Sequence, residues 1–220
     1  LLDLPKGAKV GTSSLRRRAQ LRALRPDFDV RELRGNVGTR LRKIDAGEVD
    51  AALLAAAGLR RLGLGDRIVA FMDPPDWISA PGQGAIAVQA RANDARMTAI
   101  LVALDHAHTR AAVTAERALL AALEGGCQVP IACFAELEGE QLHLRALVGD
   151  VNGQRILREE LRGPRQNAEQ LGIAVAEALL RRIRSAPARV VVAMFASHVH
   201  RVQSILGIAA ALGRKVVLAG

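Results

Sequence analysis

Ala8–Leu24 reads AKVGTSSLRRRAQLRAL and joins a short apolar run, a small polar turn and a basic segment in direct succession. The run Ala8–Val10 is typical of a strand, and residues 15–24 favour a helix. The turn GTSS at 11–14 offers hydroxyls and free backbone N–H groups at the helix start, which together can bind an anion. Arg16–Arg18 follow at once and favour the same kind of ligand, although three arginines on a helix can also form a solvated face.

The order of strand, turn and arginine occurs twice more along the chain. Phe28–Leu33 alternates like a strand and leads into the turn RGNVGTR at 34–40, before a helix to about Ala46. Val49–Ala56 is the third expected strand, and GLRRLG follows at 58–63. Strands that alternate with helices predict a mostly parallel α/β sheet, in which ligands lie at the carboxyl ends of the strands. That edge would gather these residues around one cleft: Ser13, Arg16, Arg17, Arg34, Arg40 and Arg61.

The composition favours an anionic ligand. The 220 residues carry a formal charge of +9, half of them are apolar, and only 2% are aromatic, so the core must be aliphatic. A basic chain of this kind binds either nucleic acid or small polycarboxylates. The fixed fork of arginine suits carboxylates, and the scarcity of aromatic residues argues against stacking on bases. We therefore expect carboxylate ligands and no nucleic acid.

The cysteines and histidines do not form a metal-binding pattern. Cys127 and Cys133 have no histidine or cysteine at zinc-ligand spacing, so neither a disulfide framework nor a metal site is indicated. His198 and His200 lie two apart on an expected helix and point to different sides. There is no signal peptide and no apolar run of about 18 residues, so we expect a cytoplasmic protein without a membrane span.

One cysteine lies in a turn that follows a long helix. Leu123–Pro130 reads LEGGCQVP, and the preceding residues 105–123 have helical periodicity. The two glycines can adopt positive φ and end that helix, so Cys127 would be presented on a loop. Its thiolate could then attack an electrophile. A lone cysteine is also commonly a small buried apolar residue, and the spacing alone leaves both roles open.

The residues after Cys127 predict a second, smaller domain. Ile131–Leu137, Gln141–Gly149 and Arg155–Leu161 are expected strands, separated by good turn residues, and Asn167–Arg184 has helical spacing. In the middle strand Leu142, Leu144, Ala146 and Val148 alternate, so one face should be buried. Cys133 falls within a strand and is expected to be structural. The result is a small α+β domain with a three-stranded antiparallel sheet covered by helices.

Several strings occur in the order and spacing of one family. GTSSLRR, LRGNVGTRL, AGLRRLGL, WISAPGQG and AERALLAALEGGCQVPIA resemble segments of porphobilinogen deaminase, also called hydroxymethylbilane synthase. The resemblance implies a periplasmic-binding-protein-like α/β second domain over residues 1–84. Residues 85–104 would be a crossover segment that belongs to the family's first domain, and residues 105–187 would be the cofactor-attachment domain.

The resemblance also implies the cofactor and its ligands. The matching cysteine of the family, Cys127 here, carries a dipyrromethane through a thioether. Arginines of the second domain bind the acetate and propionate groups of the cofactor and of the growing pyrrole chain. The residues expected to bind the cofactor, besides Cys127, are Ser13, Ser14, Arg16, Arg17, Arg34, Gly35, Asn36, Arg40, Arg61 and Gln83.

The implied reaction is a step of tetrapyrrole (heme) biosynthesis. A transferase of this family condenses four porphobilinogen molecules into hydroxymethylbilane, with loss of ammonia at each step, and its partners are porphobilinogen and the oligopyrrole intermediates. The full-length family protein is expected to be a monomer. Its acid–base aspartate lies in an HSMKD-like segment that these 220 residues lack, so we assign no catalytic residue. We expect an N-terminally truncated fragment with little or no activity.

The last residues resemble a different family. Residues 188–220 are similar to an interior piece of the β-CASP region of RNase J-type nucleases, without that family's HxHxDH metal-binding motif. We expect a fused or mis-joined reading frame. The nuclease-like tail and the net charge also support an alternative, a basic nucleic-acid-binding module. A further alternative is a non-catalytic carboxylate-binding α/β domain, which would need neither Cys127 nor its loop.

Overall fold

The computed structural model describes residues 1, 3–123 and 130–184. The chain divides into two compact units, Leu1–Ala186 and Pro187–Gly220. The second unit, including His198 and His200, and the Cys127 turn lie outside the described residues. The fold and the contacts below are those of the first unit.

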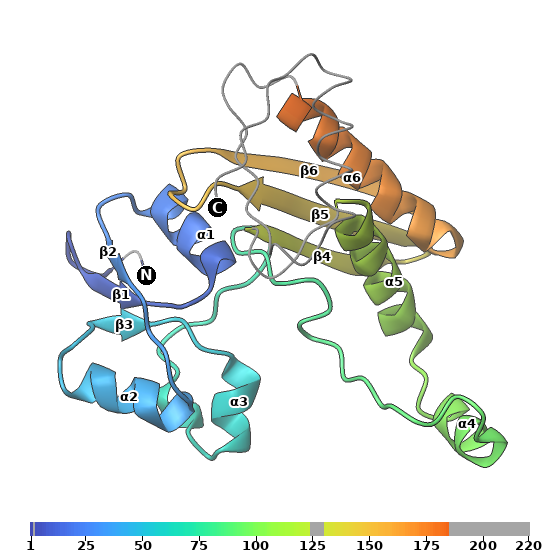
Figure 1. Cartoon of the computed structure of the whole chain (residues 1–220), viewed down its shortest axis with the longest axis horizontal. Coiled ribbons are helices and arrows are strands. Elements are labelled where there is room, and N and C mark those ends of the chain that lie inside the picture. The colour runs from blue at the N-terminus through green and yellow to red at the C-terminus, as the bar shows by residue number, and fades with distance from the viewer. Residues whose placement is uncertain (2, 124–129, 185–220) are drawn as a thin grey trace, which may run out of the picture. The chain divides into compact units, whose positions relative to one another are not determined.

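The first sheet is parallel, as the alternation of strands and helices predicts. Its strands β1 (Lys9–Gly11), β2 (Asp29–Arg31) and β3 (Ala51–Ala52) lie in the order β2-β1-β3 (Figure 1). Helices α1 (Leu15–Leu24), α2 (Val37–Asp45) and α3 (Ala56–Arg61) follow these strands in turn, and a 3-10 turn covers Gly65–Arg67. The buried core of this region consists of Ala8, Val10, Leu21, Phe28 and Trp77. Because the three strands are parallel, the turns that follow them lie at the same edge of the sheet.

The third strand is much shorter than the expected Val49–Ala56. The pairing of β3 with β1 joins only Val10 to Ala51 and Gly11 to Ala52. Beyond it, the Leu53 amide donates to the Gly11 carbonyl, and α3 begins at Ala56. A continuous run of small apolar residues has no periodicity that separates a strand from a helix start, which is why the sequence-based range was too long.

The second sheet is antiparallel, as predicted. Strands β4 (Ile131–Glu138), β5 (Gln141–Gly149) and β6 (Ile156–Pro164) lie in chain order. Helices α5 (Ala107–Ala122) and α6 (Ala168–Arg184) lie side by side and cover one face of this sheet (Figure 1), and a 3-10 turn, Arg165–Asn167, leads into α6. A Cβ atom on Gly172 would lie 2.2 Å from the Ala115 carbonyl oxygen, so glycine permits this close approach of the two helices.

The middle strand β5 is buried on both faces, which corrects the expectation of a single buried face. Leu142, Leu144 and Ala146 lie in the core beneath the helices, as the alternation predicts. On the opposite face, Leu147 packs with Ile78 in a smaller cluster, and His143 is also buried. The long-range contact with Ile78, a residue far away in the sequence, covers this face.

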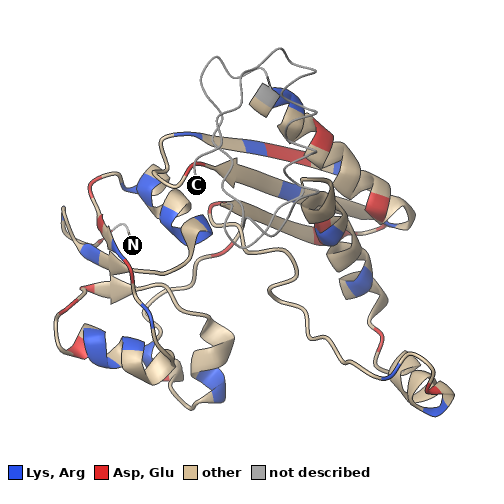
Figure 2. Cartoon of the chain, viewed as in Figure 1, with Lys and Arg blue, Asp and Glu red and all other residues tan. Residues whose placement is uncertain are grey.

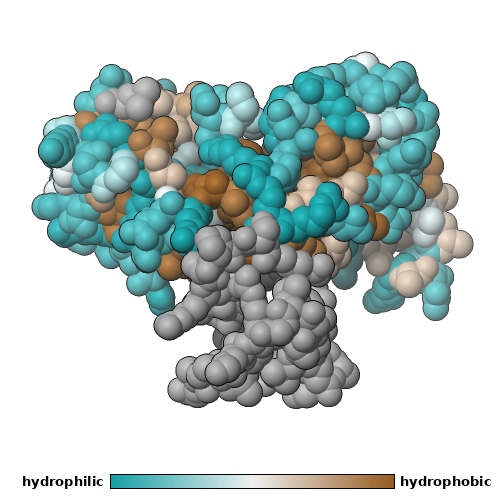
Figure 3. All heavy atoms as spheres, turned by 90° about the horizontal axis from the view of Figure 1, so that it is seen from above, coloured by the Kyte–Doolittle hydropathy of each residue, from teal (hydrophilic) through white to brown (hydrophobic). Residues whose placement is uncertain are grey.

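The segment after residue 84 contains a helix that the sequence analysis did not predict. Helix α4 (Ala95–Val102) begins at Asp94, whose carboxylate accepts from the Met97 amide. Exposed large apolar side chains of this segment are Ile86, Val88, Met97, Ile100, Val102 and Leu104. On the face that Figure 3 shows, hydrophilic residues make up most of the coloured surface, and smaller hydrophobic areas lie between them. Among the described helices, none combines the length and the apolar character that crossing a membrane would require.

Candidate functional site

The turn before α1 is held in place by its own hydroxyl groups. The Thr12 hydroxyl accepts from the Ser14 amide at 3.2 Å, and the Ser14 hydroxyl caps α1 by accepting from the Arg17 amide at 3.4 Å. Ser13 lies between them and is exposed. A Cβ atom on Gly11 would lie 2.7 Å from Leu33, so the turn packs directly against the chain after β2. Because these hydrogen bonds fix the start of α1, they also fix the backbone positions of Arg16, Arg17 and Arg18 in its first turn.

Arg16 is bound to backbone and amide oxygens but not to a carboxylate. Its Nη1 donates to the Ile78 carbonyl at 3.1 Å, and its Nη2 donates to Gln83 Oε1 at 2.9 Å. Burial, with a smaller contribution from repulsion by Arg17, lowers the pKa of Arg16 to about 10. The guanidinium is therefore still a cation at neutral pH, in a site that disfavours the charge.

Arg17 and Arg40 form a second part of the same basic group. Arg17 Nη1 donates to the Leu53 carbonyl at 2.7 Å, and burial together with repulsion by Arg40 lowers the pKa of Arg17. The Nε atoms of Arg40 and Arg18 are buried and have no hydrogen-bond partner. Across residues 1, 3–123 and 130–184, no carboxylate forms an ion pair with Arg16, Arg17 or Arg40. Buried donors and uncompensated cations of this kind favour an anionic ligand.

The remaining predicted residues lie at the other two turns of the parallel sheet. Arg34 forms an ion pair with Glu32 at 2.7 Å, and its side chain is 81% exposed. Gly35 has φ +117°, and Asn36 caps α2 by accepting from the Thr39 amide at 2.8 Å. Arg61 is exposed at the end of α3, and within the described part of the chain its side chain has no hydrogen-bond or ion-pair partner. Direct contacts or repulsion thus connect Arg16, Arg17, Arg40 and Gln83, whereas the side-chain contacts of Arg34 and Arg61 in the described part of the chain do not link them to this group.

Two buried polar residues next to this group were missed as site residues. Gln20 and Glu116 are 3% and 5% exposed, and both bind the segment that carries Ile78 and Gln83. Glu116 lies among the buried residues of α5, and Gln20 lies between the buried Ala19 and Leu21 of α1. A polar residue on the buried face of a helix is the signal that would have selected them.

The two cysteines differ in what the structure describes. Cys133 is fully buried in β4, its thiol lies 3.8 Å from the Glu116 carbonyl, and burial raises the pKa of the thiol. A buried thiol of raised pKa is not a nucleophile at neutral pH, which agrees with the predicted structural role. Cys127 lies outside the described residues, after α5 and before β4.

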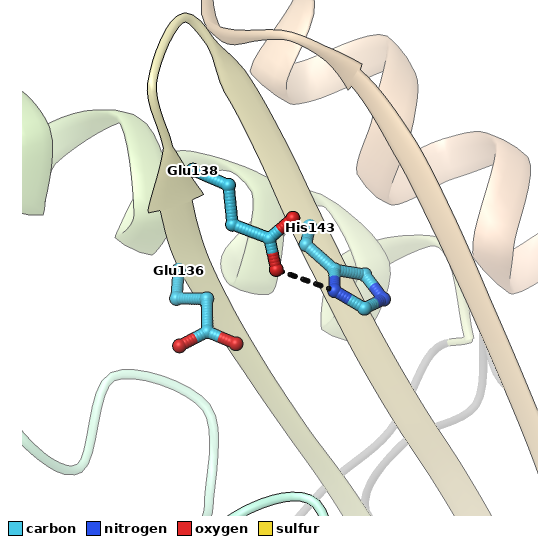
Figure 4. Close-up of side chains that lie close together, drawn as sticks. All are labelled: Glu136, Glu138 and His143. Atoms are coloured by element: carbon cyan, nitrogen blue, oxygen red, sulfur yellow. Dashed lines mark hydrogen bonds and ion pairs between the residues drawn. The ribbon is translucent and has the colours of Figure 1, made fainter.

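Three potential metal ligands meet on the antiparallel sheet, but ion pairs already occupy them. Figure 4 shows Glu136, Glu138 and His143, with Glu138 bound to His143 at 3.1 Å. Arg145 forms an ion pair with Glu136, and Arg162 forms one with Glu138 at 3.1 Å. Because guanidinium groups neutralise these carboxylates, the cluster is an ion-pair network and gives no support for a metal centre.

The charged residues near the two sheets differ in whether they are paired within the described chain. Figure 2 shows basic residues along α1, α2 and α3, beside the parallel sheet, while both basic and acidic residues occur on the antiparallel one. The dipyrromethane that the family resemblance implies would carry several carboxylates on a small framework. The uncompensated group of Arg16, Arg17 and Arg40, with a buried Nε that lacks an acceptor, fits such a polycarboxylate.

Comparison with family models covers most of the chain. The model described as porphobilinogen deaminase, dipyromethane cofactor binding domain, matches residues 1–99, and the model of the porphobilinogen deaminase C-terminal domain matches residues 110–181. Residues 187–220 match the ribonuclease J beta-CASP domain. Both resemblances noted in the sequence are thereby confirmed. Over residues 1–99 and 110–181, the chain belongs to the porphobilinogen deaminase family.

Proposed function

We propose that the chain provides the cofactor-binding part of a hydroxymethylbilane synthase. The reaction joins four porphobilinogen molecules head to tail: each C–N bond to the aminomethyl nitrogen breaks, ammonia leaves, and a C–C bond forms. One water enters when the hydroxymethylbilane is released. The observation that carries this proposal is the group of Arg16, Arg17 and Arg40, which is partly buried and has no carboxylate partner among the described residues.

The arginines would hold the carboxylates of the pyrrole chain. Arginine binds a carboxylate through two parallel N–H donors, so each bound acetate or propionate fixes a pyrrole in orientation as well as in place. Fixing two reactants in this way lowers the entropic part of the barrier to their joining. We propose that Ser13, Ser14 and the turn at 35–36 supply further donors, and that Arg34 and Arg61 bind the more exposed carboxylates.

Cys127 is the proposed attachment point of the dipyrromethane, through a thioether. When bound, the dipyrromethane supplies the pyrrole carbon to which the first porphobilinogen is joined. The 220 residues contain no HSMKD-like segment, in which the acid–base aspartate of the family lies. We therefore predict that the purified 220-residue chain produces little or no hydroxymethylbilane, and steady production would contradict this.

The decisive experiment is the intact mass of the chain purified from its natural source, with peptide mapping. We expect the chain to be heavier by two pyrrole units, all of them on Cys127 and none on Cys133. The Cys127→Ala variant, expressed in the same cells, should have the mass of the unmodified chain. Native chain of unmodified mass would contradict the cofactor assignment and favour a carboxylate-binding module without covalent chemistry.

The proposed organisation follows from the same family assignment. We propose a periplasmic-binding-protein-like domain over residues 1–84, a crossover segment over 85–104 and a cofactor-attachment domain over 105–187. Residues 188–220 would have no part in the reaction. We further propose a cytoplasmic location and no role for nucleic acid.

A further inference from the structure

The segment from Ile78 to Gln83, here called the strap, is bound to α1 by side chains of that helix. Gln20 Oε1 accepts from the Ile78 amide, and Gln20 Nε2 donates to the Ile78 carbonyl, both at 2.9 Å. The buried glutamine therefore pairs with the strap as a neighbouring strand would. Arg16 donates to the same carbonyl and to Gln83 at the other end of the strap. The position of Arg16 thus depends on where the strap lies.

The opposite side of the strap is bound to the cofactor-attachment region. Glu116 of α5 accepts from the Gly82 amide at 2.6 Å through one carboxylate oxygen and from the Ala135 amide at 2.8 Å through the other. The Cys133 amide donates to the Ser79 carbonyl at 3.1 Å. One buried carboxylate therefore joins the strap, helix α5 and strand β4.

We propose that Gln20 and Glu116 are positioning residues which, through the strap, fix Arg16 relative to the helix that leads to Cys127. The inference rests on the proposed function, because the position of Arg16 relative to this helix matters for binding only if Arg16 holds a carboxylate of a cofactor attached to Cys127. Gln20 binds two backbone groups of the strap, and Glu116 binds one backbone amide of the strap and one of β4. Both side chains are almost fully buried. Such a group holds one geometry, because any displacement leaves a buried polar atom without a partner.

A double-mutant cycle with porphobilinogen tests this coupling. Glu116→Gln keeps the size of the side chain but places an NH₂ group against one of the two backbone amides, so one hydrogen bond is lost. We expect Glu116→Gln and Arg16→Met each to weaken porphobilinogen binding, measured by calorimetry on the full chain, by roughly tenfold. The double variant should bind no more than about twofold more weakly than Arg16→Met, because a displaced strap no longer positions an arginine that is absent.

The outcomes of the cycle are distinct. A double variant in which the two losses multiply would mean that Glu116 only stabilises the fold, and would overturn the inference. Glu177→Gln is the matched control, since Glu177 is an exposed glutamate of α6, and it should bind like the native chain. If Glu116→Gln does not fold, Gln20→Met replaces it in the cycle, with the same expected result.

Hydrogen exchange tests the positioning without any ligand. Gln20→Met frees the Ile78 amide directly, so its exchange must become faster. If the strap transmits the change, the amides of Gly82 and Ala135 should also exchange faster, whereas faster exchange at Ile78 alone would overturn the inference. If the native chain binds no porphobilinogen but the faster exchange still spreads to Gly82 and Ala135 in Gln20→Met, the proposed function is rejected and the positioning role is kept.

Discussion

Partly buried arginines lie beside both sheets, but carboxylates among the described residues neutralise Arg145 on the antiparallel sheet and do not pair with Arg16 or Arg17 beside the parallel one. On the antiparallel sheet the Arg145 side chain is 16% exposed and contacts three carboxylates, those of Glu136, Glu138 and Glu160. Beside the parallel sheet, Arg16 and Arg17 are bound to neutral oxygens, and Arg40 has a buried Nε without a partner. The first group forms a closed network within the chain, whereas the second has no carboxylate partner among the described residues.

The difference matters because an unpaired charge is costly to bury. A cation removed from water destabilises the fold unless an anion compensates it, and the lowered pKa values of Arg16 and Arg17 express that cost. Residues that keep such a cost commonly serve binding or catalysis. The comparison therefore predicts that substitutions in the two groups affect different properties, binding in one and stability in the other.

The largest effect is expected for Arg40→Ala. Removing its charge should weaken binding of porphobilinogen by about a hundredfold, or about 3 kcal/mol, because a charge-assisted contact is lost. The melting temperature should stay the same or rise, since a repulsive cation is gone. Arg42→Ala is the matched control, as Arg42 is an exposed arginine of the same helix. Equal losses of affinity in the two variants would mean that net charge alone attracts the ligand.

Arg145→Ala should have the opposite profile. Its removal leaves Glu136, Glu138 and Glu160 close together with less compensation, and we expect the free energy of unfolding to fall by about 2 kcal/mol. Porphobilinogen affinity of the folded variant should not change. Urea denaturation measures the first quantity and calorimetry the second. Arg158→Ala removes an exposed arginine of β6 and serves as the control, with a stability near that of the native chain.

The sequence was sufficient for most of the secondary structure because the helices and strands have clear periodicity. Helix α1 was predicted with its observed bounds, and β5 likewise. The errors fall where long-range contacts decide. The second buried face of β5 depends on Ile78, and β3 is short because only two pairs of residues align with β1.

The candidate site was predictable in part for the same reason. Local motifs selected Arg16, Arg17 and Arg40, since each follows a turn at the sheet edge. They did not select Gln20 or Glu116, because the turn motifs contain neither residue and the partners Ile78 and Gly82 are distant in sequence. Nor could local motifs show that Arg145 is neutralised, because its carboxylate partners lie on the neighbouring strands β4 and β6. For the same reason they could not show that Arg40 has no such partner among the described residues.

Glu116 connects the strap to strand β4. The titration of its carboxyl group is expected to have the smallest effect, a change of stability with pH. Burial raises the pKa of its carboxyl group above the ordinary 4.5, while the Gly82 and Ala135 amides oppose the shift to a lesser extent. The folded state thus keeps this proton at a pH where the unfolded chain has lost it. Its contribution to stability is full below the ordinary pKa and is lost as the pH rises through the raised value.

Glu116→Gln isolates this contribution, because glutamine does not titrate. We expect the stability of the native chain relative to this variant to fall as the pH rises from below 4.5 through the raised pKa, and then to level off. Urea denaturation at a series of pH values measures the difference, and Glu177→Gln should show no comparable slope. A difference that increases with pH would mean that the two backbone amides outweigh burial, so that the residue joining the strap to strand β4 is stabilised as a carboxylate.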